Sequence, residues 1–183
     1  MRLSEARIKP IEEKDMTPEQ VAMSTPTRER YGFVFNVLKT LMHNMPLLNA
    51  WNPLAGHIMG GSSLSPRLRE IAIMRVGWQT NSEYEWGQHV LMSEAAGLTP
   101  ADHARIRLGA QAEGWSGQER AVLTATDELL ADTMLSNAAW AGLKAEFNEQ
   151  QILDVIFTVG QYNMLAMALN SVGVQREDGV PGF

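Results

Sequence analysis

The most informative feature of this sequence is an absence, because none of its 183 residues is cysteine. Disulfide bonds, thiolate nucleophiles and zinc sites built on cysteine are therefore excluded. Basic residues are also few: 15 Lys and Arg stand against 21 Asp and Glu, which gives a formal net charge of -6. No basic run interrupts this acidic balance, so we expect no nucleic acid as a partner.

Long apolar runs are missing as well. No segment approaches the roughly 18 apolar residues of a membrane span, and the first residues lack the apolar core of a signal peptide. We therefore expect no membrane partner and a cytoplasmic location. With 45% apolar and 20% charged residues, the composition is that of a globular protein with a sizeable core.

The strict alternation of apolar and polar residues that indicates a half-buried strand is absent, whereas helical spacing and capping residues recur. We predict an all-α fold of about seven or eight helices. Residues 1–30, which contain three prolines, are predicted to form a surface arm with at most one short helix, and residues 31–183 a single helical domain. Pro53 is expected to kink or divide the second helix. The expected helices cover residues 33–44, 46–61, 66–78, 82–97, 99–108, 116–130, 136–147 and 148–172.

The side chains that carry chemistry concentrate in residues 82–89, Ser-Glu-Tyr-Glu-Trp-Gly-Gln-His. Ser82 and Glu85 are spaced as a capping box, which predicts that a helix begins here. Within that helix Glu85 and His89 lie four residues apart and share one face. A carboxylate beside an imidazole orients the ring and stabilises its cation, so this pair is a candidate for proton transfer.

A second carboxylate lies in the preceding helix. Residues 68–78 are largely apolar, which predicts a helix that is buried on most of its surface. Glu70 lies within this segment, and a buried carboxylate needs a partner or a pocket. A salt bridge to Arg67 or Arg69 is the structural alternative to a chemical role.

Structural explanations also exist for the residues of the 82–89 stretch. In a capping box the carboxylate of Glu85 turns back to the backbone N–H of Ser82, which is a purely structural task. His89 fits a hydrogen-bonded histidine in a helix interface equally well on position alone. Tyr84 and Trp86 are residue types that pack more often than they contact substrates.

Four strings in this part of the chain resemble the carboxymuconolactone decarboxylase family, which includes the alkylhydroperoxidase AhpD-like proteins. They are Leu-Ser-Pro-Arg-Leu-Arg-Glu at 64–70, Arg-Val-Gly-Trp at 75–78, Glu-Tyr-Glu-Trp-Gly-Gln-His at 83–89 and Ala-Ala-Gly-Leu-Thr at 95–99. The resemblance implies an all-helical fold that assembles as a homo-oligomer, a trimer or a hexamer.

The peroxidase branch of that family carries Cys-x-x-Cys-x-x-x-His, with a glutamate on the helix before it. Its cysteine positions correspond to Ser82 and Glu85, its glutamate to Glu70 and its histidine to His89. Peroxide reduction requires a thiolate that is oxidised and then regenerated. The resemblance therefore does not extend to thiol peroxidase activity.

The decarboxylase branch is similar in having Glu-x-x-x-His where this chain has Glu85 and His89, and the reaction it implies needs neither sulfur nor a cofactor. We therefore predict a decarboxylase-like lyase, without cofactor or metal, that acts on a small organic acid or lactone. In this prediction His89 is the general acid or base, Glu85 its orienting partner and Glu70 a second proton-handling carboxylate. The predicted substrate-binding residues are Tyr84, Trp86 and Ser82.

Two other interpretations stay open. The chain fits a catalytically silent oligomeric binding protein that has the same fold. It also fits a metal-dependent enzyme, because Glu70, Glu85 and His89 form a legitimate ligand set for iron, manganese or zinc. A pocket lined by all three side chains favours an enzyme, whereas dry, filled packing around His89 favours the silent protein.

Overall fold

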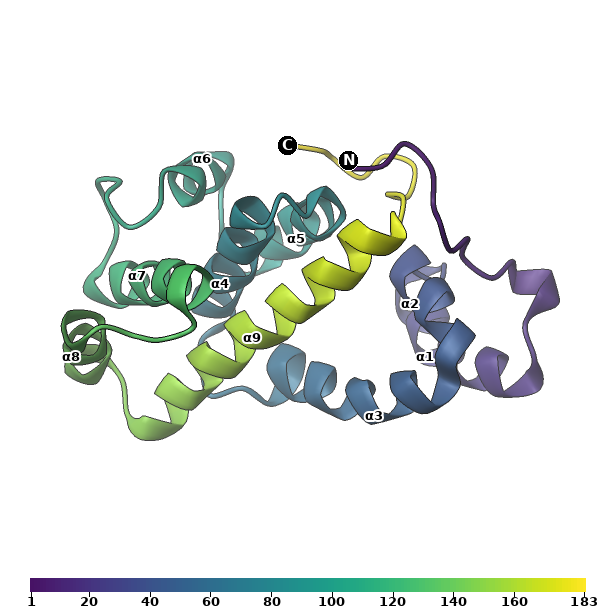
Figure 1. Ribbon diagram of the computed structural model, residues 1–183, viewed down its shortest axis with the longest axis horizontal. Coiled ribbons are helices and arrows are strands. Elements are labelled where there is room, and N and C mark those ends of the chain that lie inside the picture. The colour runs from purple at the N-terminus through teal and green to yellow at the C-terminus, as the bar shows by residue number, and fades with distance from the viewer.

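The protein is helical throughout, as the computed structural model of residues 1–183 shows (Figure 1), and the predicted all-α class is confirmed. Two short 3-10 turns, η1 (Glu13–Asp15) and η2 (Met42–Asn44), and one π-helical turn, η3 (His57–Gly61), connect the longer elements. The α-helices are α1 (Pro18–Tyr31), α2 (Asn36–Leu41), α3 (Met45–Gly56), α4 (Pro66–Gln79), α5 (Glu83–Ala95), α6 (Pro100–Leu108), α7 (Gly117–Asp132), α8 (Asn137–Glu146) and α9 (Glu149–Val172).

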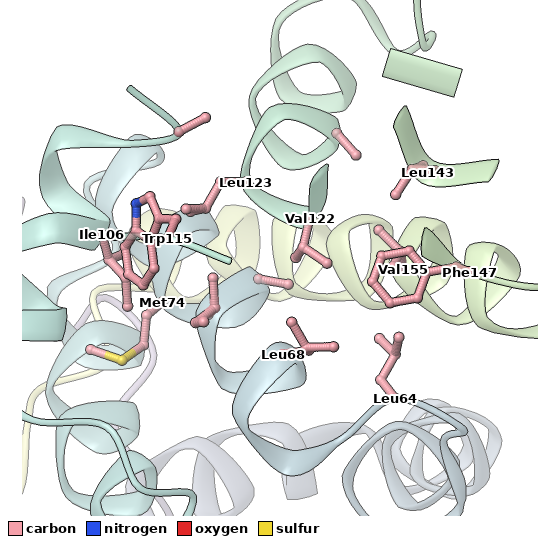
Figure 2. Packing of buried hydrophobic residues seen from close by; sticks show 14 of the residues in the cluster. Leu64, Leu68, Met74, Ile106, Trp115, Val122, Leu123, Leu143, Phe147 and Val155 are labelled. Atoms are coloured by element: carbon pink, nitrogen blue, oxygen red, sulfur yellow. The ribbon is translucent and has the colours of Figure 1, made fainter. Parts of the chain in front are cut away.

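Helix α4 is the centre of the fold and packs against α5, α7 and α9. Helix α9 runs diagonally across the molecule, with α6, α7 and α8 on one side and α1, α2 and α3 on the other (Figure 1). The largest apolar cluster lies where α4, α7 and α9 meet, and Figure 2 shows its interlocking side chains. Those labelled there are Leu64, Leu68, Met74, Ile106, Trp115, Val122, Leu123, Leu143, Phe147 and Val155.

Local capping chemistry explains where most helices begin. A serine, threonine or asparagine side chain accepts a hydrogen bond from a backbone N–H of the first turn, which satisfies a donor that has no partner inside the helix. The predicted starts of α4, α6, α7, α8 and α9 are confirmed in this way. The capping residues are Ser65, Thr99, Ser116, Ser136 and Asn148.

The prolines interrupt the helices less than expected. Helix α1 has 14 residues rather than the short helix predicted, because a capping box at Thr17 starts it and Gly32 in the left-handed conformation ends it. Pro26 lies inside α1 with its ring exposed to solvent. Helix α3 likewise continues through Pro53 to Gly56 and passes into η3. The boundary between an arm and a domain near residue 30 stays a prediction.

Helix α9 corrects the expectation that no segment of the chain is apolar enough to span a membrane. By length and composition it is apolar enough to cross a membrane, with a mean hydropathy of 1.4 over an 18-residue window. Half of that window is buried inside the protein, as is usual for the central helix of a folded domain. Its outward face nevertheless carries four exposed apolar side chains: Leu153, Phe157, Met164 and Met167.

The two ends of the chain lie close together beside α5 (Figure 1). The N–H of Arg7 donates to the carbonyl of Val172 at 2.7 Å, and the side-chain amide of Gln175 donates to the carbonyl of Leu3 at 3.1 Å. Gly87 on α5 permits close contact with the C-terminal tail, because a Cβ there would lie 2.2 Å from the carbonyl oxygen of Pro181.

Glu177 in this tail joins α2 to α5. Its Oε1 accepts hydrogen bonds from the N–H of Asn36 at 2.6 Å and from the hydroxyl of Tyr84 at 2.9 Å. Its Oε2 accepts from the side-chain amide of Gln88. The tail therefore fixes two side chains of α5 from outside the helix.

Leu123 should be one of the residues on which stability depends most, because it is fully buried in the largest cluster. Leu123→Ala is expected to lower the free energy of unfolding by about 2–5 kcal/mol, since it removes apolar contacts and leaves a cavity. Leu108→Ala is the matched control, because Leu108 is 72% exposed, and it should change stability by no more than about 0.5 kcal/mol. Urea denaturation of the three proteins tests this; equal losses in both variants would contradict the core described here.

The ionisation of Tyr84 should report the position of Glu177. Burial raises the pKa of Tyr84 well above its usual range, and the charge of Glu177 raises it further. Glu177→Gln should therefore lower the pKa of Tyr84 but leave it above the ordinary value. An ultraviolet titration of tyrosinate, assigned with Tyr84→Phe, measures the shift, and Glu94→Gln on the exposed side of α5 is the control. An unchanged titration in Glu177→Gln would show that the tail does not hold Glu177 against Tyr84.

Candidate active site

A buried hydrogen bond joins α4 to α5. Nδ1 of His89 lies 2.7 Å from Oε2 of Glu70, and the two residues are 5% and 1% exposed. The other oxygen of Glu70, Oε1, accepts from Nε and Nη2 of Arg69 at 3.3 and 3.1 Å. Both oxygens of Glu70 are thus occupied, and one of them determines how the His89 ring is oriented.

The charge state of Glu70 follows from these contacts. Burial alone would raise its pKa, but the charge and hydrogen bond of His89 and the guanidinium of Arg69 outweigh burial and hold the pKa below its ordinary value. An ionised carboxylate only accepts hydrogen bonds, so Nδ1 of His89 carries a proton and donates it. Nε2 is then the ring nitrogen that remains for proton transfer.

The predicted capping box at Ser82 and Glu85 is wrong. The Ser82 side chain is fully buried and makes no capping hydrogen bond. Its backbone N–H, which the Glu85 carboxylate would have accepted from, already donates to the carbonyl of Gly77 at 2.8 Å. Because the tight turn from α4 to α5 satisfies this donor, Glu85 is released from a capping role.

Glu85 is instead a buried carboxyl without a hydrogen-bond partner. Both of its oxygens are inaccessible and unpaired, and the residue is 2% exposed. Burial raises its pKa well above the ordinary value, which keeps the group protonated and neutral. The predicted hydrogen bond between Glu85 and His89 does not form: the two residues share a face of α5, but the imidazole pairs with Glu70 on α4.

A cavity of about 220 Å³ lies against these residues, with Glu85 and His89 in its wall. Most of its lining is apolar, and the other polar side chains include Tyr84, Gln88 and Tyr162. Glu70 lies behind His89 and faces a neighbouring cavity instead. Two of the three predicted catalytic side chains therefore meet at one cavity, and the third holds the histidine in place. The apolar members of the lining are Phe35, Val37, Leu38, Trp51, Ala55, Met59, Met92, Leu165 and Leu169.

The predicted substrate-binding residues divide into two groups. Tyr84 lines the cavity, although its hydroxyl is engaged, donating to Glu177 at 2.9 Å and accepting from the N–H of Val37 at 3.2 Å. Trp86 and Ser82 are fully buried and do not line the cavity. The Trp86 ring packs in the apolar core with its centre 5.6 Å from that of Trp78. A helix presents successive residues to different sides, so these aromatic neighbours in sequence have different environments.

Tyr162 and Gln161 on α9 are site residues that the sequence analysis missed. The ring of Tyr162 meets that of His89 edge to face, with 5.1 Å between centres, and its hydroxyl donates to the sulfur of Met59 at 3.1 Å. Burial and the nearby charge of Glu70 raise the pKa of Tyr162 well above its usual value. The side-chain oxygen of Gln161 is buried without a partner. The signal was a polar Gln-Tyr-Asn interruption in the apolar run of α9.

The structure does not favour the metal site considered as an alternative. No group of three or more His, Asp or Glu side chains is arranged to hold a metal ion. Glu70 is already shared between His89 and Arg69, and a guanidinium beside a carboxylate disfavours a cation at the same oxygens.

Comparisons with known proteins agree with this fold. The Carboxymuconolactone decarboxylase family matches residues 46–128, while no curated protein shows significant sequence similarity. An uncharacterized peroxidase-related protein from Silicibacter sp. TM1040 is 19% identical, with a TM-score of 0.82 over 97% of this chain and 96% of that one. A second such protein, an alkylhydroperoxidase AhpD core from Ralstonia eutropha JMP134, is 17% identical, with a TM-score of 0.81 over 93% of each chain.

The debrominase Bmp8, solved as a cysteine-to-alanine variant in complex with 2,3,4-tribromopyrrole, is a further structural neighbour. It is 15% identical, with a TM-score of 0.79 over 96% of this chain and 94% of that one. At such identities these likenesses establish the fold. Residues 46–128, which carry Glu70, Glu85 and His89, thus match the carboxymuconolactone decarboxylase family, within a chain that has the AhpD-like fold and no cysteine.

Proposed function

We propose that this protein is a cofactor-independent, decarboxylase-like lyase that acts on a small organic acid or lactone. The observation that carries the proposal is a neutral, unpaired Glu85 beside His89 at the wall of one cavity, with His89 oriented by an ionised Glu70. Perturbed ionisable groups gathered at a cavity are typical of sites that transfer protons.

The three side chains take roles that differ from those expected from the sequence. Glu70 is the orienting carboxylate, because it accepts a hydrogen bond from Nδ1 of His89 and stabilises the imidazolium. His89 gives or takes a proton through Nε2. Glu85, which is uncharged, is the proton donor that the sequence analysis did not anticipate.

These roles suit the loss of carbon dioxide. The bond between the substrate carbon and its carboxylate breaks, the electron pair stays on the carbon, and carbon dioxide leaves. The carbanion then takes a proton from a neutral acid, the role that we assign to Glu85, and the Glu85 carboxylate regains a proton before the next turnover. A mostly apolar cavity assists because it keeps water away from the reacting carboxylate.

The size and lining of the cavity support a small ring compound as substrate. Its volume of about 220 Å³ is small, and apolar side chains form most of its wall. The structural neighbour Bmp8 holds a brominated pyrrole, which is also a small ring. A catalytically silent protein of the same fold is the weaker alternative, because His89 borders open space rather than filled packing.

The first test is a double-mutant cycle on Glu70 and His89, run on whichever small acid or lactone stabilises the folded protein in a thermal-shift screen. His89→Ala should lower kcat by about 10²–10⁴-fold, the usual contribution of a positioned acid–base group. Glu70→Gln keeps the shape of the side chain but loses the charge that orients the ring, so its activity should fall as well. The double variant should be scarcely worse than His89→Ala, because the two residues act as a unit.

Glu94→Gln is the control for this cycle, because Glu94 is exposed on α5 and should keep full activity. If the losses of activity in Glu70→Gln and His89→Ala, expressed as free energies, simply add in the double variant, the two residues work independently. A fully active His89→Ala variant would remove the proposed mechanism altogether.

The second test concerns Glu85 and pH. In the unfolded chain this carboxyl ionises near pH ~4.3, whereas burial keeps it protonated to a higher pH in the folded protein. Between pH ~4.3 and the pKa of Glu85 in the folded protein, the folded state binds one more proton than the unfolded state. The free energy of unfolding therefore falls as the pH rises, by up to about 1.4 kcal/mol per pH unit. Glu85→Gln removes this pH-dependent loss of stability, because glutamine does not ionise. The variant should match the parent below about pH 4 and become progressively more stable than it as the pH rises above that value.

Urea denaturation of both proteins across this pH range gives the comparison, with Glu94→Gln again as the control. A stability difference between Glu85→Gln and the parent that does not change with pH would show that Glu85 ionises normally in the folded protein. It would then not be available as a neutral proton donor.

A further inference from the structure

A second, larger cavity adjoins the first. It has a volume of about 730 Å³ and lies between the C-terminal end of α1 with the loop that follows, the start of α4, and α5. The inner and outer cavities share four wall residues, and Glu70 lines the outer one from behind His89. Its volume is within the range of small-molecule sites. The shared residues are Phe35, Met59, Gln88 and Met92.

The charge of the outer cavity is positive where a ligand would meet it. Two arginines, Arg30 and Arg69, and a single carboxylate, Glu70, are among its lining residues. Glu70 is occupied by His89 and by Arg69 itself. Arg30 is exposed and forms no ion pair within the chain, and its guanidinium lies 5.2 Å from the centre of the Tyr31 ring. It is therefore a cation with free donors at the edge of a cavity.

Aromatic rings lie next to this cation. Tyr31 and Phe33 are 42% and 39% exposed, and both rings meet that of Phe35 edge to face, with centres 5.1 and 4.9 Å apart. All three residues line the outer cavity. Exposed aromatic faces beside an unpaired guanidinium match a flat ligand that carries an acid group. The aromatic rings can contact the plane of such a ligand, and the arginine can bind its carboxylate.

We propose that the outer cavity binds aromatic or similarly planar organic acids, with Arg30 as the residue that recognises the carboxylate. This inference names a substrate class for the proposed function and so rests on it. The acid enters past Arg30 and the three aromatic rings, and Phe35, Met59, Gln88 and Met92 form the boundary that it crosses to reach His89.

Binding of three simple probes tests this without any turnover: benzoate, benzamide and acetate, measured by titration calorimetry on the full chain. Benzoate should bind more tightly than benzamide, which has the same ring without the charge, and than acetate, which has the charge without the ring. Arg30→Gln should weaken benzoate about three- to tenfold, the effect expected of a partly exposed charge-assisted contact, and leave benzamide unchanged. Arg30→Lys should restore part of the affinity for benzoate.

Arg28→Gln is the matched control, because Arg28 also lies in the last turn of α1 but pairs with Glu13 at 3.0 Å and does not line the cavity. It should bind all three probes like the parent. Equal affinity for benzoate and benzamide, or an unchanged benzoate affinity in Arg30→Gln, overturns the inference. The readout is binding, so it tests the site separately from the proposed function. If Arg30 confers charge-selective binding but no acid is turned over, the binding site is supported and the proposed function is contradicted.

Discussion

The hydrogen bond from Nδ1 of His89 to Oε2 of Glu70 connects α5 to α4 at a point where both helices are buried. Breaking such a pair from one side leaves an uncompensated charge inside the protein, which is strongly destabilising. The rest of the site depends on this bond, because it selects the tautomer of His89 and leaves Nε2 for chemistry. It also determines which carboxylate is ionised. Arg69 completes the arrangement by taking the second oxygen of Glu70, so no further group is needed to satisfy it.

Glu85, which lies on α5 with His89, differs from Glu70 in its hydrogen bonding. Its oxygens have no partner and its pKa is raised, so two adjacent helices carry one ionised carboxyl, Glu70 on α4, and one neutral carboxyl, Glu85 on α5. A buried polar group without a hydrogen bond costs about 1–3 kcal/mol. Nothing in the packing of α5 requires a carboxyl there, because an apolar side chain of similar size would avoid this cost. Groups that persist in such an environment are characteristic of functional sites.

The helices could be predicted from the sequence because their signals are local: a serine, threonine or asparagine at the start, a glycine at the end and apolar residues at helical spacing. The pairing within the site could not, because it depends on contacts between helices. Spacing alone places Glu85 beside His89, yet the ring turns across to α4, where Glu70 is available. The capping box failed for a similar reason, since the turn after Gly77 had already bonded the N–H of Ser82. Tyr162 is distant in sequence and comes to His89 only through the packing of α9.

The absence of cysteine leaves acid–base groups as the reactive side chains of this site. In a chain without cysteine, a site on residues 82–89 has no thiolate chemistry, and its side chains offer proton transfer, hydrogen bonding and apolar contact. The wall of the inner cavity carries a neutral acid, an oriented imidazole and mostly hydrocarbon. Such a surface suits the reaction that we propose, in which negative charge moves from an oxygen to a carbon and is then quenched by a proton. Two acidic side chains lie behind the cavity wall: Glu70 behind the imidazole, and Glu177 behind Tyr84 and Gln88. The geometry thus separates the groups that hold the site in shape from those that line the cavity.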